Sequence, residues 1–414
     1  MSRFIIQGQR RLTGAFTPTG NKNAVLPMLA ACVLTDEPVT LHNVPRIQDV
    51  QVMLELLTQM GASVSRSERS VTVCAKGLKK RRLDPELCKR VRASILFAGP
   101  LAARHGRAVL FPPGGDVIGR RRLDTHFYGL HALGISVQGG EFYTFRRKQL
   151  RGADLLLDEA SVTATENIVM AAVLARGRTT IMNAACEPHV QDLCLLLRKM
   201  GARITGTGTN LLKISGVERL RGAEHRIGPD YIEMGSYIAA AAATHGELTV
   251  NCDGDDFGAM RVIERTFRKL GVGSRTLRIQ RDLGSAIPKI EDGSWPMFPS
   301  DLMSVSIVLA TQARGSALFF EKMFESRLYF VDRLIEMGAH IVQCDPHRVL
   351  VQGPARLHAI HMSSPDIRAG MAMLVAALCA KGQSVIDQAQ VIDRGYESVE
   401  ERLRALGAEI VREE

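Results

Sequence analysis

The sequence predicts an α/β protein of two domains, each built from three repeated βαβαββ-like units. Three observations support this fold class. A chain of 414 residues is too long for one compact core and suits two domains of about 200 residues each. One helix–glycine–strand pattern recurs six times along the chain, and a second set of helices is apolar on nearly every side.

The recurring pattern is an amphipathic helix that ends in Leu or Met, followed by Gly and then by a strand-like stretch. Its glycines, which lie about 70 residues apart, are Gly61, Gly134, Gly201, Gly271, Gly338 and Gly407. Glycine adopts the left-handed conformation at a helix C-terminus without steric cost, and the β-branched residues that follow favour a strand. Each glycine is therefore expected at a helix-to-strand corner.

A second helix, rich in Ala, Leu and Met, is predicted in each repeat. The ranges are 23–34, 93–103, 166–175, 232–243, 301–313 and 367–380, with strands expected at 39–44 and 179–183. Helices that are apolar nearly all round belong inside a ring of sheets. A period near 70 exceeds the 20–50 residues typical of solenoids, so we expect three units around a shared core in each domain.

The composition is that of an ordinary globular protein, with 46% hydrophobic and 23% charged residues. No apolar run approaches the roughly 20 residues that span a bilayer, and the first residues lack the apolar core of a signal peptide. These features predict a cytoplasmic protein without a membrane partner.

Lys and Arg number 53 against 43 Asp and Glu, so an anionic partner is expected. The basic runs at 79–82 and 146–148 lack interleaved aromatic residues and are interpreted as solvated edges. No C-x-x-C pair occurs among the eight cysteines, which are Cys32, Cys74, Cys88, Cys186, Cys194, Cys252, Cys344 and Cys379. Neither disulfides nor a metal site are expected.

Eight short motifs carry a resemblance. They are GNKNA (20–24), RAS (92–94), PGGDVIG (113–119), SVTATEN (161–167), FPSD (298–301), FESR (324–327), DIR (366–368) and DRGY (393–396). In this order, and over residues 4–411, the chain resembles the enolpyruvyl transferase family. The resemblance implies the inverse α/β prism of that family, with residues 1–21 plus 230–414 in one domain, 22–229 in the other, and the active site in the cleft between them.

The resemblance also implies an activity. The enolpyruvyl group of phosphoenolpyruvate would pass to the 3′-hydroxyl of UDP-N-acetylglucosamine by addition and elimination, with release of phosphate, as the first committed step of peptidoglycan synthesis. No metal or organic cofactor is expected. The residue pattern leaves the oligomeric state open.

Most of the residues that would bind phosphoenolpyruvate are basic. Lys22 opens a predicted helix, where its ammonium and the free N–H groups can face one anion; a capping loop with a solvent-facing lysine is the alternative. The two anionic groups of phosphoenolpyruvate also require converging guanidinium groups. By resemblance, the phosphate is assigned Lys22, Arg121 and Arg394, the carboxylate region Arg327 and Arg368, and the same substrate Asn23 and Asp366.

Two carboxyl groups would transfer protons. Asp301 precedes a predicted helix, where capping is the alternative role, and the resemblance makes it the base for the 3′-hydroxyl. Asp116, in a loop rich in Gly and Pro, occupies the position where many family members have a cysteine. That cysteine is the general acid and the target of the epoxide fosfomycin, so we expect Asp116 to be the acid and the protein to be fosfomycin-resistant.

For the sugar nucleotide, the resemblance implies contacts from both predicted domains. The residues are Asn23, Arg92, Arg121, Arg122, Leu123, Asp124, Thr125, Ser161, Val162, Thr163, Asp301 and Met323. Thr163 and Arg122 replace a small residue and a proline that are common in the family, and Leu96 stands where some members have Trp. Two alternatives remain: a paralogue that acts on another nucleotide such as UMP, and a nucleic-acid-binding protein.

Overall fold

The computed structural model describes residues 2–116, 118–119, 121–273 and 286–414. The chain divides into two compact units. Unit 1 contains Met1–Thr19, Asp116–Arg120 and Pro229–Glu414, and unit 2 contains Gly20–Gly115 and Arg121–Gly228. The loop at 116–120, which we expected in the second domain, groups with unit 1. The domain limits expected from the resemblance stay a prediction.

Unit 2 alternates short strands and helices. Its elements are α1 (Lys22–Ala31), η1 (Cys32–Leu34), β3 (Val39–His42), α2 (Gln48–Met60), β4 (Ser63–Ser67), β5 (Ser70–Cys74), η2 (Ala75–Gly77), α3 (Pro85–Arg90), η3 (Arg92–Phe97), α4 (Ala98–His105), β6 (Arg107–Leu110), α5 (Asp124–Ala132), β7 (Ile135–Gln138), β8 (Tyr143–Arg147), β9 (Asp154–Leu156), α6 (Val162–Ala172), β10 (Arg178–Met182), α7 (Pro188–Lys199), β11 (Arg203–Thr205), β12 (Leu211–Ser215) and β13 (Ala223–Arg226).

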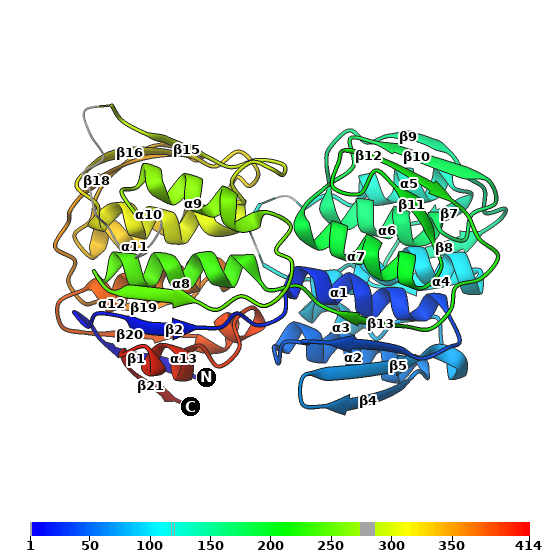
Figure 1. The fold of residues 1–414 in the computed structure, drawn as a ribbon, viewed down its shortest axis with the longest axis horizontal. Helices are drawn as coiled ribbons and strands as arrows, with labels where there is room; N and C mark the ends of the chain where they lie inside the picture. The colour runs from blue at the N-terminus through cyan, green and yellow to red at the C-terminus, as the bar shows by residue number, and fades with distance from the viewer. Residues whose placement is uncertain (1, 117, 120, 274–285) are drawn as a thin grey trace. The chain divides into compact units, whose positions relative to one another are not determined.

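The described strands of unit 2 form sheets of order β13-β3-β5-β4, β6-β8-β7 and β11-β12-β10-β9. In the view of Figure 1, the first of these lies at the bottom of the unit and the last at the top, with α1 and α6 between them. The apolar side chains of α1, α4 and α6 belong to one continuous core. The chain thus buries its most apolar helices inside three sheets.

Unit 1 is built in the same way. Its elements are β1 (Arg3–Gln7), β2 (Thr13–Phe16), α8 (Tyr231–Ala243), β14 (Glu247–Val250), α9 (Ala259–Lys269), β15 (Lys289–Glu291), η4 (Ser300–Leu302), α10 (Met303–Gln312), β16 (Gly315–Phe320), α11 (Val331–Glu336), β17 (His340–Asp345), β18 (Arg348–Gly353), β19 (His361–Ser363), α12 (Ile367–Cys379), β20 (Gln383–Asp387), η5 (Ala389–Arg394), α13 (Val399–Ala405) and β21 (Glu409–Glu413).

The described strands of unit 1 form the sheets β19-β20-β1-β21, β15-β16-β18-β17 and the pair β14-β2. Helices α8, α10 and α12 lie side by side between the first two sheets (Figure 1). They share a second core, separate from that of unit 2. Strand β1, from the start of the chain, pairs with β20 and β21 from its end.

The predicted corners are confirmed. All six glycines have positive φ angles, between 81° at Gly271 and 104° at Gly201, as a left-handed helix terminus requires. Strands β4, β7, β11, β17 and β21 follow five of them. The strand predicted after Gly271 lies at 274–285, outside the described residues.

The predicted inner helices are also confirmed, with two refinements. Every residue of α8 is buried, and so are nearly all residues of α12. The helix expected at 93–103 is instead a 3-10 segment, η3, that continues into α4. The helix expected at 301–313 likewise begins with the 3-10 turn η4. The α/β class predicted from the sequence is therefore correct.

Candidate active site

The clearest polar cluster of unit 1 joins Asp301 to two buried arginines. Arg327 Nη2 lies 3.1 Å from Asp301 Oδ1, and Arg368 Nη2 lies 3.0 Å from Oδ2. The arginine side chains are 2% and 6% exposed, whereas that of Asp301 is 27% exposed. The carboxylate is thus fixed on both oxygens and still reaches solvent.

Asp301 does not cap the helix that it precedes. It lies inside η4, and neither η4 nor α10 has a side-chain cap hydrogen bond. The capping role considered from the sequence is therefore wrong, because the carboxylate accepts from guanidinium groups. This arrangement leaves a carboxylate positioned to accept a proton from a ligand.

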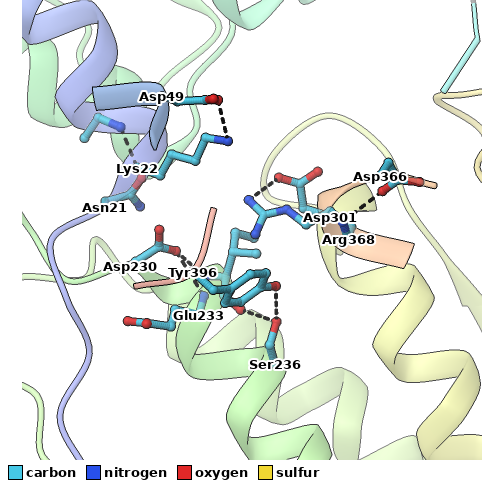
Figure 2. Close-up of polar contacts among 12 residues, drawn as sticks. Asn21, Lys22, Asp49, Asp230, Glu233, Ser236, Asp301, Asp366, Arg368 and Tyr396 are labelled. Atoms are coloured by element: carbon cyan, nitrogen blue, oxygen red, sulfur yellow. Dashed lines mark hydrogen bonds and ion pairs between the residues drawn. The ribbon is translucent and has the colours of Figure 1, made fainter. Parts of the chain in front are cut away.

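The start of α12 positions Arg368. Asp366 is the N-cap, and its Oδ1 accepts hydrogen bonds from Arg368 N at 2.8 Å and Ala369 N at 2.9 Å. The Arg368 guanidinium also lies over the Tyr396 ring, whose hydroxyl is 2.8 Å from Ser236 Oγ (Figure 2). Burial raises the pKa of Asp366, although the charge of Arg327 opposes this. Asp366 therefore serves the site by orienting Arg368.

Arg394 and Asp116 form a second ion pair of unit 1. Arg394 Nη1 lies 2.5 Å from Asp116 Oδ1, with side chains 19% and 16% exposed. Arg394 ends η5. The preceding residue, Asp393, accepts hydrogen bonds from both terminal nitrogens of the Arg412 guanidinium, each at 2.7 Å. The structure thus brings together two of the residues predicted for proton transfer and phosphate binding.

In unit 2, Lys22 is directed at a carboxylate. Asn21 caps α1 by accepting from Ala24 N at 3.1 Å, and Lys22 is the first helical residue. Lys22 Nζ lies 2.9 Å from Asp49 Oδ2, and both side chains are almost fully buried (Figure 2). The solvent-facing alternative for Lys22 is wrong: the ammonium faces an anion, and that anion is Asp49. Asn23, the next residue of α1, is half-buried.

Arg92 connects η3 to the segment predicted to bind uracil. It donates to the backbone oxygens of Arg121 and Arg122. Burial, together with the charge of Arg121, lowers the pKa of Arg92 to about 10. Leu123 precedes α5, which Asp124 opens.

Side chains at the start of α5 fix this segment further. Arg122 forms an exposed ion pair with Asp124. Buried Thr125 donates to Asp158 Oδ1 at 3.1 Å. Arg92 and the residues from Arg121 to Thr125 therefore form one patch at the start of α5.

Ser161, Val162 and Thr163 form the start of α6, with Ser161 at the N-cap position. Thr163 Oγ1 lies 3.0 Å from His126 Nε2, and His126 Nδ1 lies 3.1 Å from Asn167 Nδ2. Burial, helped by the charge of Arg92, lowers the pKa of His126 to about 3. A neutral imidazole thus links the starts of α5 and α6, the two segments predicted for the nucleotide.

Met323 is 44% exposed, as a contact to a sugar requires, and its N–H donates to Glu321 Oε1 at 3.0 Å. The basic runs at 79–82 and 146–148 are exposed, which confirms their interpretation as edges. All eight cysteines are free thiols. Within the described ranges, no group of three or more His, Cys, Asp or Glu side chains is placed to hold a metal ion.

In the part of the chain that the structure describes, no helix combines the length and apolarity needed to cross a bilayer.

Comparison with known proteins places the chain in a family. A family model described as EPSP synthase (3-phosphoshikimate 1-carboxyvinyltransferase) matches residues 6–403. The chain belongs to this family. The resemblance to enolpyruvyl transferases that the eight motifs indicated is thereby confirmed.

Relatives within the family match the chain end to end. A protein of Bradyrhizobium diazoefficiens named UDP-N-acetylglucosamine 1-carboxyvinyltransferase is 52% identical, over 99% of this chain and 98% of its own. A protein of the same name from Treponema denticola is 50% identical, over 99% of both chains.

Among solved structures, the enolpyruvyl transferase NikO from Streptomyces tendae has a TM-score of 0.87 at 22% identity and covers 100% of this chain and 99% of its own. An EPSP synthase from Acinetobacter baumannii has a TM-score of 0.75 at 18% identity, over 100% of both chains. At these identities the likeness shows the enolpyruvyl transferase fold alone, and this agrees with the predicted fold class.

Several further buried residues contact the predicted site residues, and only one of them lies in a motif recognised in the sequence. Asp49, His126 and Asn167 each contact a predicted residue or its helix, and Glu321 accepts a hydrogen bond from the backbone N–H of Met323. Asn167 is the last residue of the SVTATEN motif at 161–167, so the sequence marked it. The other three occur in ordinary helix and strand contexts, and only their partners in space reveal them.

Proposed function

We propose that this protein is an enzyme that transfers the enolpyruvyl group of phosphoenolpyruvate to the 3′-hydroxyl of UDP-N-acetylglucosamine, releasing phosphate, in the first committed step of peptidoglycan synthesis. The observation that carries the proposal is the end-to-end identity of 45–52% to relatives that bear that name. The polar clusters supply the chemistry that such a reaction needs. A cytoplasmic location stays a prediction.

Phosphoenolpyruvate recognition follows from the ion pairs. Asp301 and Asp116 each form ion pairs with arginine guanidinium groups. A guanidinium presents paired N–H donors that match the oxygens of a carboxylate or a phosphate. An incoming carboxylate can therefore bind beside Asp301 at Arg327 and Arg368, and an incoming phosphate can compete with Asp116 for Arg394. That Lys22 and Arg121 also contribute to phosphate binding stays a prediction from the resemblance.

Proton transfer follows from the two aspartates. Asp301 takes the proton of the 3′-hydroxyl as that oxygen forms a bond to C2 of phosphoenolpyruvate, and Asp116 gives a proton to C3. The tetrahedral intermediate then returns a proton from C3 to the Asp116 carboxylate while the bond from C2 to the phosphate oxygen breaks. The proton held by Asp301 leaves with the phosphate, so both carboxyl groups return to their starting states.

Arg394 also links Asp116 to phosphate recognition. In the ion pair, Asp116 contacts the guanidinium that the substrate phosphate is proposed to bind. Phosphate binding would therefore separate Asp116 from Arg394 before Asp116 acts on C3.

A phosphate-release assay with a panel of acceptors tests the proposal. UDP-N-acetylglucosamine should give rapid, phosphoenolpyruvate-dependent phosphate release, whereas UMP, UDP-glucose and shikimate 3-phosphate should give at least about 100-fold less, because a polar site rejects acceptors that leave its groups unpaired. Faster release with UMP would favour the paralogous acceptor. No release with any acceptor, together with tight binding of an RNA oligomer, would favour the nucleic-acid alternative.

The second prediction is that the wild-type protein resists fosfomycin and that Asp116→Cys is inactivated by it in a time-dependent, covalent way. A carboxylate is a much poorer nucleophile toward an epoxide than a thiolate. Activity loss and peptide mass mapping measure the effect. The exposed thiols Cys252 and Cys344 are present in both proteins, so adducts there serve as the internal control. An adduct at Asp116 in the wild type, or none at the new cysteine, would remove this residue from the reacting position.

A further inference from the structure

Two fully buried carboxyl groups, those of Glu321 and Asp292, lie side by side next to the segment that carries Asp301. Glu321 follows β16 and Asp292 follows β15, and these strands pair in parallel with Glu291 opposite Phe320. Both side chains are 0% exposed. Two adjacent carboxylates without water repel one another strongly, so a buried pair of this kind needs a specific arrangement of protons.

The hydrogen bonds define that arrangement. Glu321 Oε1 accepts from Met323 N at 3.0 Å and Phe324 N at 3.1 Å, so this oxygen acts as an acceptor. Asp292 Oδ1 accepts from Lys322 N at 2.6 Å. Among the described residues, no ordinary donor reaches Asp292 Oδ2, although it is buried. A proton on Glu321 Oε2 would supply the missing donor.

The charged groups around Glu321 agree with a bound proton. Burial, then the hydrogen bond and charge of Asp292, raise the pKa of Glu321 to about 9, and the charge of Arg327 only partly opposes them. His347 Nδ1 lies 2.8 Å from the Glu321 backbone oxygen. Lys322, on the adjoining turn, pairs with Glu291 at 2.8 Å.

The pair connects to Asp301, the proposed base, and to Arg327, one of its two arginine partners. Ser300 Oγ donates to Glu321 at 2.9–3.0 Å, and Ser300 directly precedes Asp301. The turn that Glu321 holds through Phe324 leads to Arg327, whose N–H donates to Phe324 O at 3.4 Å and whose guanidinium lies 5.1 Å from the Phe324 ring centroid. One carboxyl group thus contacts the segments that carry the base and one of its arginines.

We propose that Glu321 is a positioning residue for the transfer reaction: it carries a proton that it donates to Asp292, and in this neutral form it holds the Ser300 turn and the Phe324 turn so that Asp301 and Arg327 meet the substrates. The role of Glu321 in the reaction rests on the proposed function. The presence of a proton on Glu321 does not depend on that function. Loss of the proton would place two charges in contact and loosen both turns.

The pH dependence has a defined sign. A carboxyl group whose pKa is higher in the folded than in the unfolded chain binds a proton on folding, so its stabilising effect is fully present at low pH and is lost as pH rises towards the folded value. Wild-type kcat should therefore fall as pH rises through about 9, where Glu321 ionises.

The test is Glu321→Gln, because its amide can donate to Asp292 while its oxygen accepts from Met323 and Phe324 at any pH. At pH 7.5 we expect kcat within about 2-fold of wild type, and between pH 8 and 10 a smaller loss than in the wild type, whereas Glu321→Ala should lower kcat at least about 10-fold. Other groups that titrate in this range are present in both proteins, so their effects cancel when the two pH profiles of kcat are compared. Glu291→Gln, at the neighbouring, partly exposed carboxylate, is the matched control and should leave the profile unchanged.

Melting temperature against pH gives a readout that does not depend on the reaction. The wild type should lose stability relative to Glu321→Gln from pH 6 to pH 9, and the difference should then level off. If no acceptor gives phosphate release but this melting curve is observed, the proposed function is wrong, and the proton between Glu321 and Asp292 is still supported. A folded Glu321→Gln that loses more than 10-fold in kcat at pH 7.5, or a constant difference in melting temperature, would overturn the inference. If Glu321→Gln does not fold, Asp292→Asn supplies the donor from the other side and should show the same two curves.

Discussion

Asp301→Asn is expected to lower kcat by roughly 100- to 10,000-fold, the range that general base catalysis contributes. The amide keeps the shape of the carboxyl group but cannot take the proton of the acceptor hydroxyl at neutral pH. The KM for phosphoenolpyruvate should change much less, since Arg327 and Arg368 remain. Steady-state phosphate release measures both constants, and a melting curve reports the fold.

Asp301→Ala should give a comparable loss and also lower the melting temperature. Arg327 and Arg368 are almost fully buried, and removing their shared partner leaves two unpaired charges. Breaking a buried ion pair costs about 3–5 kcal/mol, and the partial exposure of Asp301 places the expected cost at or below the lower end.

The matched control for Asp301 is Asp345→Asn. Asp345 also pairs with an arginine, Arg348, at 2.6 Å, and its side chain is 29% exposed, close to the 27% of Asp301. It should leave kcat unchanged. Near-normal turnover of Asp301→Ala with an unchanged melting temperature would show that another group is the base.

Arg394→Ala is expected to lower kcat/KM for phosphoenolpyruvate by roughly 100- to 1,000-fold, the usual effect of removing one group that stabilises transition-state charge. Affinity for the sugar nucleotide alone, measured by calorimetry, should change little, because Arg394 is assigned to the phosphate. Arg394→Lys should recover part of the loss: it restores a charge but not the paired hydrogen bonds of a guanidinium.

Arg333→Ala is the control for Arg394. Arg333 forms an exposed ion pair with Glu336 at 2.6 Å and should be neutral, as surface pairs usually are. Equal kcat/KM values for Arg394→Ala and the wild type would exclude Arg394 from phosphate recognition. Loss of sugar-nucleotide affinity in place of phosphoenolpyruvate affinity would move Arg394 to the other substrate.

The fold was predictable from the sequence because its signals are local. A glycine with positive φ after a helix, and a helix that is apolar all round, are properties of consecutive residues, and the six corners and inner helices follow from them. The boundaries were less accurate at α4 and α10, where a 3-10 turn precedes the α-helix. Hydrophobic periodicity does not distinguish those two helix types.

The sequence selects the candidate site residues only through motifs spread over the whole chain, and their roles stay a prediction. A single arginine among 53 basic residues has no local mark of function. The resemblance selected Asp301, Arg327 and Arg368, and the structure shows them in contact. It did not indicate that Asp116 pairs with Arg394 in the substrate-free chain, a contact between residues far apart in sequence.

The sequence by itself determined the α/β class, the sixfold repeat, the family and the residue types available for catalysis. Only the tertiary structure decided which residues pair, as Lys22 does with Asp49, and how burial shifts the pKa values of His126 and Glu321. The physical reason is that secondary structure depends on neighbours within one turn or strand, whereas the protonation of a buried group depends on desolvation and on charges that folding brings within a few ångströms. Those charges come from distant segments, and no local pattern encodes them.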